Sequence, residues 1–206
     1  MNAKVLKRFV VYMAILTFVM FTVWALVRSF MNRPPGDYET EVCDIRLKDQ
    51  LYDQAIQAAN KALEKTPNHR GAIMCKALVF ISQKMYVEAN QELDYLINFL
   101  ETTVQDDDQT GIGTLAAAYA NRGIIKDRNK NYEEALQDYV KALGIDYEAV
   151  AGPGLGTIIL NYKFKSSSVK ERALYLNEQL QLPKDERVLS IKELDEGQVM
   201  HKPSKL

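Results

Sequence analysis

The feature that most constrains the fold is a short pattern that recurs along the chain. Tyr52 and Ala55 recur as Tyr86 and Ala89, a shift of 34 residues, and a third copy begins at Tyr132, 46 residues beyond the second. Aromatic and small residues within each copy are spaced by three and four, which places them on one face of a helix. A repeat of this length predicts helical hairpins that bury their apolar faces by stacking on one another.

These residues resemble the signature of the tetratricopeptide repeat family, in which each repeat is a pair of antiparallel helices. In the third copy, Arg122 stands at a usual Leu position and Tyr147 at a usual Pro position. The resemblance covers about residues 36–147 and implies an all-α solenoid of about three hairpins, at residues 37–69, 70–101 and 114–147. The signature positions are Tyr52, Ala55, Ala62, Ala77, Tyr86, Ala89, Gly123, Tyr132, Ala135, Tyr139 and Ala142.

The function that this resemblance implies is protein binding. In the family, the first helices of the repeats line a concave groove that accepts an extended peptide or a partner helix. The main matching positions are Asp44, Lys48, Met74, Leu78, Ile81, Ala117, Ala120, Asn121, Ile124 and Arg128. The same register also places Asp37, Thr40, Leu47, Gly71, Ser82 and Asp127 on the lining of the groove. Only Asn121 matches the side chains with which some of these domains hold a C-terminal carboxylate, so that clamp is not expected.

The centre of this predicted groove is apolar. An exposed apolar surface of this kind marks a partner site, or it is covered by the protein's own tail. A register error of one residue changes the face that a side chain occupies, so the alternative is that some of these residues belong to the core.

The first thirty residues predict a transmembrane helix. Residues 9–27 carry no charge, and as a helix they span about 28 Å, close to the thickness of the hydrocarbon core. Tyr12 and Trp24 lie near the ends of this run, where aromatic rings favour the interface. The alternative is a cleaved signal peptide, whose apolar region is shorter and precedes a small-residue cleavage site. Here Arg28 follows and no such site is present, which favours an anchor spanning residues 9–28.

Charge is distributed unevenly along the chain. Five of the 26 basic residues and none of the 27 acidic residues precede residue 34, so the remainder has a net charge of −6. An acidic domain argues against binding to nucleic acid, which needs a cationic surface. Lys4, Lys7 and Arg8 favour a cytoplasmic N-terminus, with the repeats on the periplasmic side of a bacterial inner membrane. A domain facing the cytosol is the alternative.

Prolines, turn residues and helix-capping residues indicate where the segments within and before the repeats begin and end. Residues 31–36 predict a short linker that contains two prolines. Hairpin turns are expected near residues 48–51, 83–85 and 127–131, and Asn131 with Glu134 predicts a capping box after the last turn.

Beyond the repeats, AGPGLG at 151–156 predicts a helix break and lacks the context of a phosphate-binding loop. The segment at 155–164 favours a packing helix, with a strand as the alternative. Ser168 and Glu171 predict a capping box, so residues 148–183 supply capping helices or a degenerate fourth repeat. Residues 184–206 form a tail that we expect to be partly ordered by docking on the body.

Few residues suggest a metal-binding or redox-active site. Asp106, Asp107 and Asp108 lack the alternate spacing and the final Glu of a calcium loop, which favours a solvated loop over a metal site. Cys43 and Cys75 form no CxxC motif, and neighbouring helices usually pack about 8–10 Å apart, so free buried thiols are expected. An oxidising compartment would instead favour a disulfide.

Enzyme signatures are missing from the sequence. It contains no nucleotide-binding, serine hydrolase, metalloprotease or kinase motif, and His69 and His201 have no recognisable partner. The final Ser-Lys-Leu matches a peroxisomal address, which we attribute to coincidence in an anchored chain. The sequence therefore predicts a membrane-anchored, non-catalytic scaffold or adaptor without cofactor, metal or small-molecule substrate. The alternatives are a chaperone-like or secretion-associated assembly factor and, more remotely, a metal- or thiol-dependent enzyme.

Overall fold

The structure is a computed structural model that describes residues 3–31, 33–150 and 168–191. Every regular element within these ranges is a helix, which confirms the predicted all-α class. The expected break at 151–156, the segment 155–164, His201 and the final Ser-Lys-Leu lie outside the described residues.

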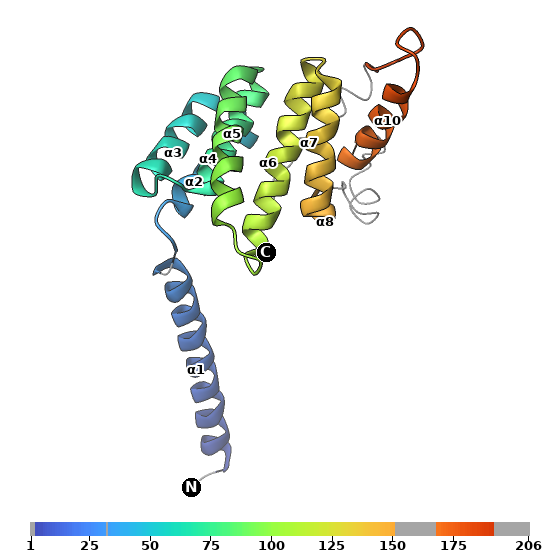
Figure 1. The fold of residues 1–206 in the computed structure, drawn as a ribbon. Coiled ribbons are helices and arrows are strands. Elements are labelled where there is room, and N and C mark those ends of the chain that lie inside the picture. Colours follow the sequence, from blue (N-terminus) through green and yellow to red (C-terminus); the bar gives the residue numbers. More distant parts are fainter. Residues whose placement is uncertain (1–2, 32, 151–167, 192–206) are drawn as a thin grey trace.

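Successive antiparallel hairpins stand side by side and form the body of the protein (Figure 1). They pair α2 (Asp37–Lys48) with α3 (Tyr52–Lys65), α4 (Arg70–Ser82) with α5 (Tyr86–Thr103), and α6 (Gln109–Arg128) with α7 (Tyr132–Ile145). The short helix α8 (Tyr147–Val150) follows, and α10 (Val169–Gln181) packs on α7 at the end of the stack.

The turns of these hairpins share one backbone geometry. Gln50, Lys84 and Lys130 each have a positive φ, of 61°, 60° and 65°. The residue after each of them donates its N–H to a carbonyl five residues back, as in the common Schellman ending of a helix. These positions are 34 and 46 residues apart, as the signature tyrosines are, so the sequence repeat is also a repeat of backbone conformation.

Small signature residues allow the two helices of a hairpin to approach closely. Ala55, Ala89 and Ala135 are fully buried where the second helices pack. A Cβ atom at Gly123 would lie 2.7 Å from the ring of Tyr139, so this ring packs directly on the backbone of α6. The recurring small and aromatic residues thus mark the contacts inside each hairpin.

The insertion between the second and third repeats lengthens helices more than it lengthens a loop. Helix α5 continues to Thr103 and α6 begins at Gln109, so residues 104–108 alone connect them. The loop that contains Asp106 and Asp107 is therefore short.

The two predicted capping boxes differ in outcome. Ser168 and Glu171 form both hydrogen bonds of the box at the start of α10, as predicted. Asn131 occupies the N-cap position of α7 but makes no side-chain cap hydrogen bond, so that prediction is wrong.

Helix α1 (Ala3–Met31) extends away from the hairpins (Figure 1). Residues Ala3–Arg28 are long and apolar enough to cross a membrane, and none of this segment is buried against the rest of the protein. A signal sequence near an N-terminus has the same properties.

Candidate functional site

The first helices of the hairpins form a continuous layer, since α2 packs on α4 and α4 packs on α6. We call the ten predicted groove residues on this layer the inner face. Helix α2 supplies Asp44 and Lys48, α4 supplies Met74, Leu78 and Ile81, and α6 supplies Ala117, Ala120, Asn121, Ile124 and Arg128.

The apolar members of the inner face are buried. On α4, Met74, Leu78 and Ile81 are 1–3% exposed, and on α6, Ala117, Ala120 and Ile124 are at most 1% exposed. The fully buried Asn121 donates a hydrogen bond to Sδ of Met74 at 3.6 Å, which links the two helices. Lys48 is exposed, and Asp44 and Arg128 are half-buried. The side chains at the centre are therefore buried and are not open to solvent.

Helix geometry shows which way the centre of the inner face points. Lys76 binds Glu92 of α5 at 2.7 Å, so this side of α4 faces the second helices. Met74 and Leu78 each lie two residues from Lys76, about 160° around the helix, and point away from α5. In α6, Arg122 binds Asp94 of α5 and Asp138 of α7, so this side of α6 also faces the second helices. Ala120 and Ile124 each lie two residues from Arg122, about 160° around the helix, and point away from them.

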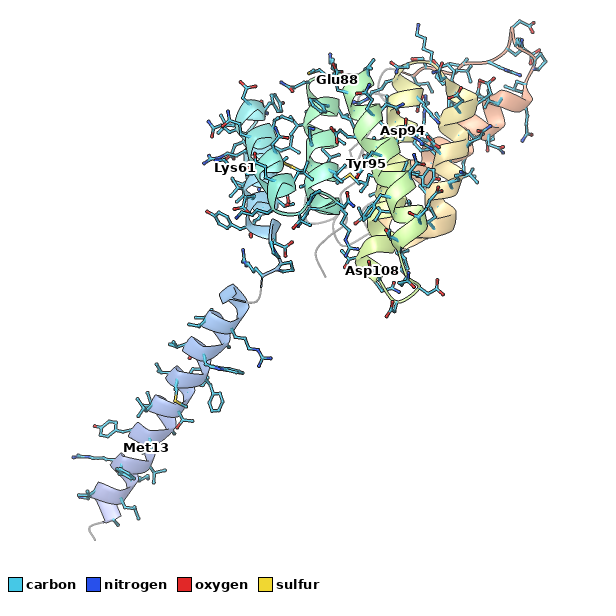
Figure 2. The ribbon with its side chains drawn as sticks, turned by 60° about the vertical axis from the view of Figure 1, so that its left-hand side comes forward. Met13, Lys61, Glu88, Asp94, Tyr95 and Asp108 are labelled. Carbon is cyan, nitrogen blue, oxygen red and sulfur yellow. A yellow bond between two sulfur atoms is a disulfide. The ribbon has the colours of Figure 1, made fainter. Side chains whose placement is uncertain are left out.

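The charged layer around Arg122 has a structural role. Nε and Nη2 of Arg122 each donate to Asp138 at 2.8 Å, and Nη1 donates to Asp94, labelled in Figure 2, at 2.7 Å. The hydrogen bonds to Asp138, reinforced by Asp94, raise the pKa of Arg122 above its ordinary value. Burial and a hydrogen bond to Glu101 raise the pKa of Tyr119 to about 12, so its hydroxyl stays protonated at neutral pH. Arg122 thus replaces the usual Leu with ion pairs that join three helices.

His69 has partners that the sequence did not reveal. Its Nδ1 accepts the N–H of Ala72 at 3.3 Å and caps α4, while Nε2 lies 2.9 Å from Oδ1 of Asp37. The hydroxyl of Thr40 lies 3.3 Å from Nδ1, an arrangement that superficially resembles a catalytic triad. Because Nδ1 already accepts the cap bond and the buried Thr40 hydroxyl donates to the carbonyl of Gly36 at 2.9 Å, these groups fix the start of α2 against α4.

The three adjacent aspartates have different environments. Asp106 and Asp107 are exposed, whereas Asp108 is the N-cap of α6 at the end of the stack from which α1 extends (Figure 2). Asp108 accepts the N–H of Gly111 at 2.8 Å and forms an ion pair with Arg70 of α4. Among the described residues, no group of three or more His, Cys, Asp or Glu side chains is arranged to hold a metal.

We predict that Asp108→Ala lowers the free energy of unfolding by about 1–2 kcal/mol, because it removes a helix cap. The hydrogen bond from Arg70, followed by that from Gly111, holds the pKa of Asp108 below its ordinary value. The stabilisation is thus complete above the unfolded-state pKa near 3.8 and is lost as the pH falls through the lower folded-state pKa. Urea unfolding of the full chain in detergent micelles between pH 2 and 7 measures both effects.

The neighbouring residue supplies the control for this prediction. Asp107→Ala should change the unfolding free energy by less than about 0.5 kcal/mol, since Asp107 is exposed. Asp108→Asn should keep the cap but lose this part of the acid sensitivity. Equal effects of the two alanine substitutions would contradict the assignment.

Cys43 and Cys75 form a disulfide that joins α2 to α4, so the prediction of free thiols is wrong. Their Cα atoms are 6.4 Å apart, within the range that a disulfide spans. The usual spacing of about 8–10 Å refers to helix axes, and each Cα lies about 2.3 Å from its axis. Facing Cα atoms of two packed helices therefore come close enough to be bridged.

Asp127 lies in a buried ion pair that joins the last repeat to α10. Its two carboxylate oxygens each accept a hydrogen bond from Arg172 at 2.7 Å, and Oδ2 also accepts the hydroxyl of Tyr139 at 3.1 Å. Both charged side chains are at most 3% exposed. Arg172 also donates to the carbonyl of Leu189 at 2.9 Å, which holds the start of the tail beside the C-terminal end of α6. Sequence periodicity placed Asp127 among the lining positions of the groove but gave no sign of this distant partner.

Comparison with solved structures shows a likeness of fold. No family model matches the sequence, and no curated protein matches it. Among solved structures, the chain is similar to one described as the Arabidopsis OM64 TPR domain, with 17% sequence identity and a TM-score of 0.45. The match covers 55% of this chain and 84% of that one.

Proposed function

We propose that this protein is a membrane-anchored, non-catalytic scaffold that binds an extended peptide or a helix of another protein along its inner face. The observation that carries the proposal is the apolar surface of α4 and α6, which points away from the helices that complete each hairpin. Met74, Leu78, Ala120 and Ile124 contribute apolar or small side chains there. Such side chains suit contact with the apolar side chains of an extended peptide or of a partner helix.

The polar clusters support a structural role over a catalytic one. The charges around Arg122, the His69 contacts and Asp108 all hold helices together, and each has protein partners at hydrogen-bond distance. A hollow of about 420 Å³ is lined by Asp37, His69, Arg70 and Asp108. His69 and Asp108 there accept the N-terminal N–H groups of α4 and α6, so both side chains act as helix caps. The proposal therefore assigns binding to the inner face and stability to these clusters.

We place the hairpins on the outer, non-cytoplasmic side of the membrane, with periplasm of a bacterial inner membrane as the proposed compartment. The basic residues before the apolar run of α1 support a cytoplasmic N-terminus. The disulfide adds independent support, because such bonds form and persist in oxidising compartments. A cleaved signal sequence would place the hairpins in the same compartment without a tether.

Site-specific photocrosslinking in native membranes tests the binding surface. A photoreactive amino acid at Lys48 or Arg128, at the accessible margins of the inner face, should yield protein adducts of discrete mass. Val87 on α5 and Val140 on α7 are the matched controls, because they are 70% and 57% exposed on the second helices. Adducts at the controls alone, or equal adducts at all four positions, would refute the assignment of the inner face.

A further inference from the structure

The hollow of about 420 Å³ lies at the end of the stack from which α1 extends. It is bounded by the starts of α2, α4 and α6 and by the end of α5, and Asp108, labelled in Figure 2, belongs to its wall. Asn68 and Thr103 in its lining are exposed, so the hollow is open to solvent. A hollow of this volume accepts a small molecule or the polar part of a larger one.

The charged groups of the hollow are only partly used by the protein. Nη1 of Arg70 binds Asp108, and no other donor of this guanidinium has a protein partner among the described residues. Oδ1 of Asp37 lies 2.9 Å from Nε2 of His69, and within the same part of the chain its Oδ2 has no partner. The side chains of Arg70 and Asp37 are 34% and 39% exposed, so a ligand in the hollow has access to both.

The balance of charge favours a ligand that carries both signs. Asp37 and Asp108 supply two negative charges and Arg70 one positive charge, so the lining has a net charge of −1 when His69 is counted as neutral. An anion alone is disfavoured there, since the lining and the exposed aspartates 106 and 107 of the adjoining loop repel it. A zwitterion offers a cation to Asp37 and an anion to Arg70.

We propose that the hollow binds the zwitterionic phosphoethanolamine headgroup of a membrane lipid. The phosphate accepts hydrogen bonds from the unused donors of Arg70, and the ammonium donates to Oδ2 of Asp37. The apolar part of the lining, which includes Phe99, Leu100 and Val104, contacts the carbon atoms beside the phosphate. The inference rests on the proposed membrane anchor, and it gives the anchored hairpins a second contact with the bilayer.

The linker keeps the hollow close to the bilayer. Pro34 belongs to its lining, and Arg28 ends the predicted membrane span. From Arg28 the chain continues as helix to Met31, and Pro34 follows three residues later, so Pro34 lies at most about 15 Å from Arg28. The headgroup layer itself is about 5–8 Å thick on each side of a bilayer. A lipid in that layer can therefore place its headgroup in the hollow.

Lipid headgroups differ in what they offer to these side chains. The ammonium of phosphoethanolamine has N–H donors, whereas the quaternary ammonium of phosphocholine has none. The phosphoglycerol headgroup is an anion without a cation. Because a hydrogen bond to a charged group is at stake, we expect phosphatidylethanolamine to be preferred over phosphatidylcholine by about tenfold.

Photocrosslinking in nanodiscs measures this preference. The full chain carries a photoreactive amino acid at Thr103 and is placed in nanodiscs that contain the two lipids in equal amounts with identical acyl chains. Mass spectrometry should detect phosphatidylethanolamine adducts in about tenfold excess. Asp107 is the matched control, because it is exposed at the same end of the stack but lies outside the lining, and its adducts should follow the bulk composition. Equal ratios at the two positions would overturn the proposal.

Substitutions separate the contributions of the two charges. Asp37→Asn removes the charge that receives the ammonium, and Arg70→Gln removes the donors for the phosphate. Each should reduce the excess at Thr103 to the ratio found at Asp107. Asp106→Asn removes an exposed charge at the same end and should leave the excess unchanged. Urea unfolding in detergent micelles verifies that each variant is folded, and an excess that survives both substitutions in folded protein would refute the site.

Soluble headgroups distinguish a lipid from a free zwitterion. Phosphoethanolamine added to the nanodiscs should lower the excess at Thr103, and phosphocholine at the same concentration should not. If soluble phosphoethanolamine binds the full chain in micelles but no lipid excess forms in nanodiscs, the hollow takes a free zwitterion and the lipid assignment is wrong. A chain that does not enter nanodiscs would refute the anchor as well, whereas an inserted chain without the excess would refute the headgroup site alone.

Discussion

Asp127→Ala is expected to lower the free energy of unfolding by about 3–5 kcal/mol, one of the largest effects of a single substitution in this protein. The substitution leaves the guanidinium of Arg172 buried, at 1% exposure, without its carboxylate partner. It also removes an acceptor from the buried hydroxyl of Tyr139. Urea unfolding of the full chain in detergent micelles, followed by circular dichroism, measures the change.

A double-mutant cycle separates the ion pair from the packing around it. Arg172→Met should cost a similar amount, because it leaves the Asp127 carboxylate buried and unneutralised. The combined variant with Asp127→Leu and Arg172→Met should recover most of the loss, since apolar side chains of similar volume suit a buried site. If the two single losses simply add in the combined variant, the residues do not act as a buried pair.

The repeat architecture was predictable because its determinants are local in sequence. The spacing of Tyr86, Ala89 and their counterparts predicts the helix faces that pack within each hairpin, and the structure contains those hairpins. The turns also lie where the sequence predicts them, since α2 ends at Lys48 and α4 ends at Ser82. In these segments the helix propensity of the residues and the spacing of the apolar side chains both favour the observed helices.

The errors concern relations between segments that are distant in sequence. The disulfide was missed because spacing between helix axes was used for a distance between Cα atoms. The caps supplied by His69 and Asp108 were missed because a cap depends on backbone angles, and those angles follow from packing against other helices. Asn131 is the converse case, since it has a suitable residue type and makes no side-chain cap hydrogen bond.

The candidate site was only partly predictable. The ten residues predicted from the register lie on first helices, and the ion pairs of Lys76 and Arg122 indicate the direction in which the predicted face points. Periodicity cannot tell how far such a face is buried, because burial depends on contacts between parts of the chain that are distant in sequence. Asp127 illustrates the point, since its partner Arg172 lies 45 residues away.

Replacing Cys43 and Cys75 with alanine is expected to lower the free energy of unfolding by about 3–4 kcal/mol. The bond closes a loop with a sequence separation of 32 and restricts the unfolded chain accordingly. Both cysteines are 0% exposed, so the loss also includes a small packing defect in the contact between α2 and α4. Urea unfolding of the oxidised full chain and of the double variant, both in detergent micelles, gives the difference.

Single variants show whether the bond or the individual side chains provide this stability. Cys43→Ala and Cys75→Ala each abolish the crosslink, so each should lose nearly as much as the double variant, and their effects should not add. Reducing the unfolded wild-type chain before refolding should lower its stability to a similar level, because reduction removes the same constraint. Additive single losses that persist after reduction would mean that packing, and not the covalent link, joins the first two repeats.

In native membranes, thiol-specific labelling of the denatured protein should require prior reduction if the hairpins occupy an oxidising compartment. Complete labelling without reductant would place them on the cytosolic side and would remove the support that the disulfide gives to the proposed orientation.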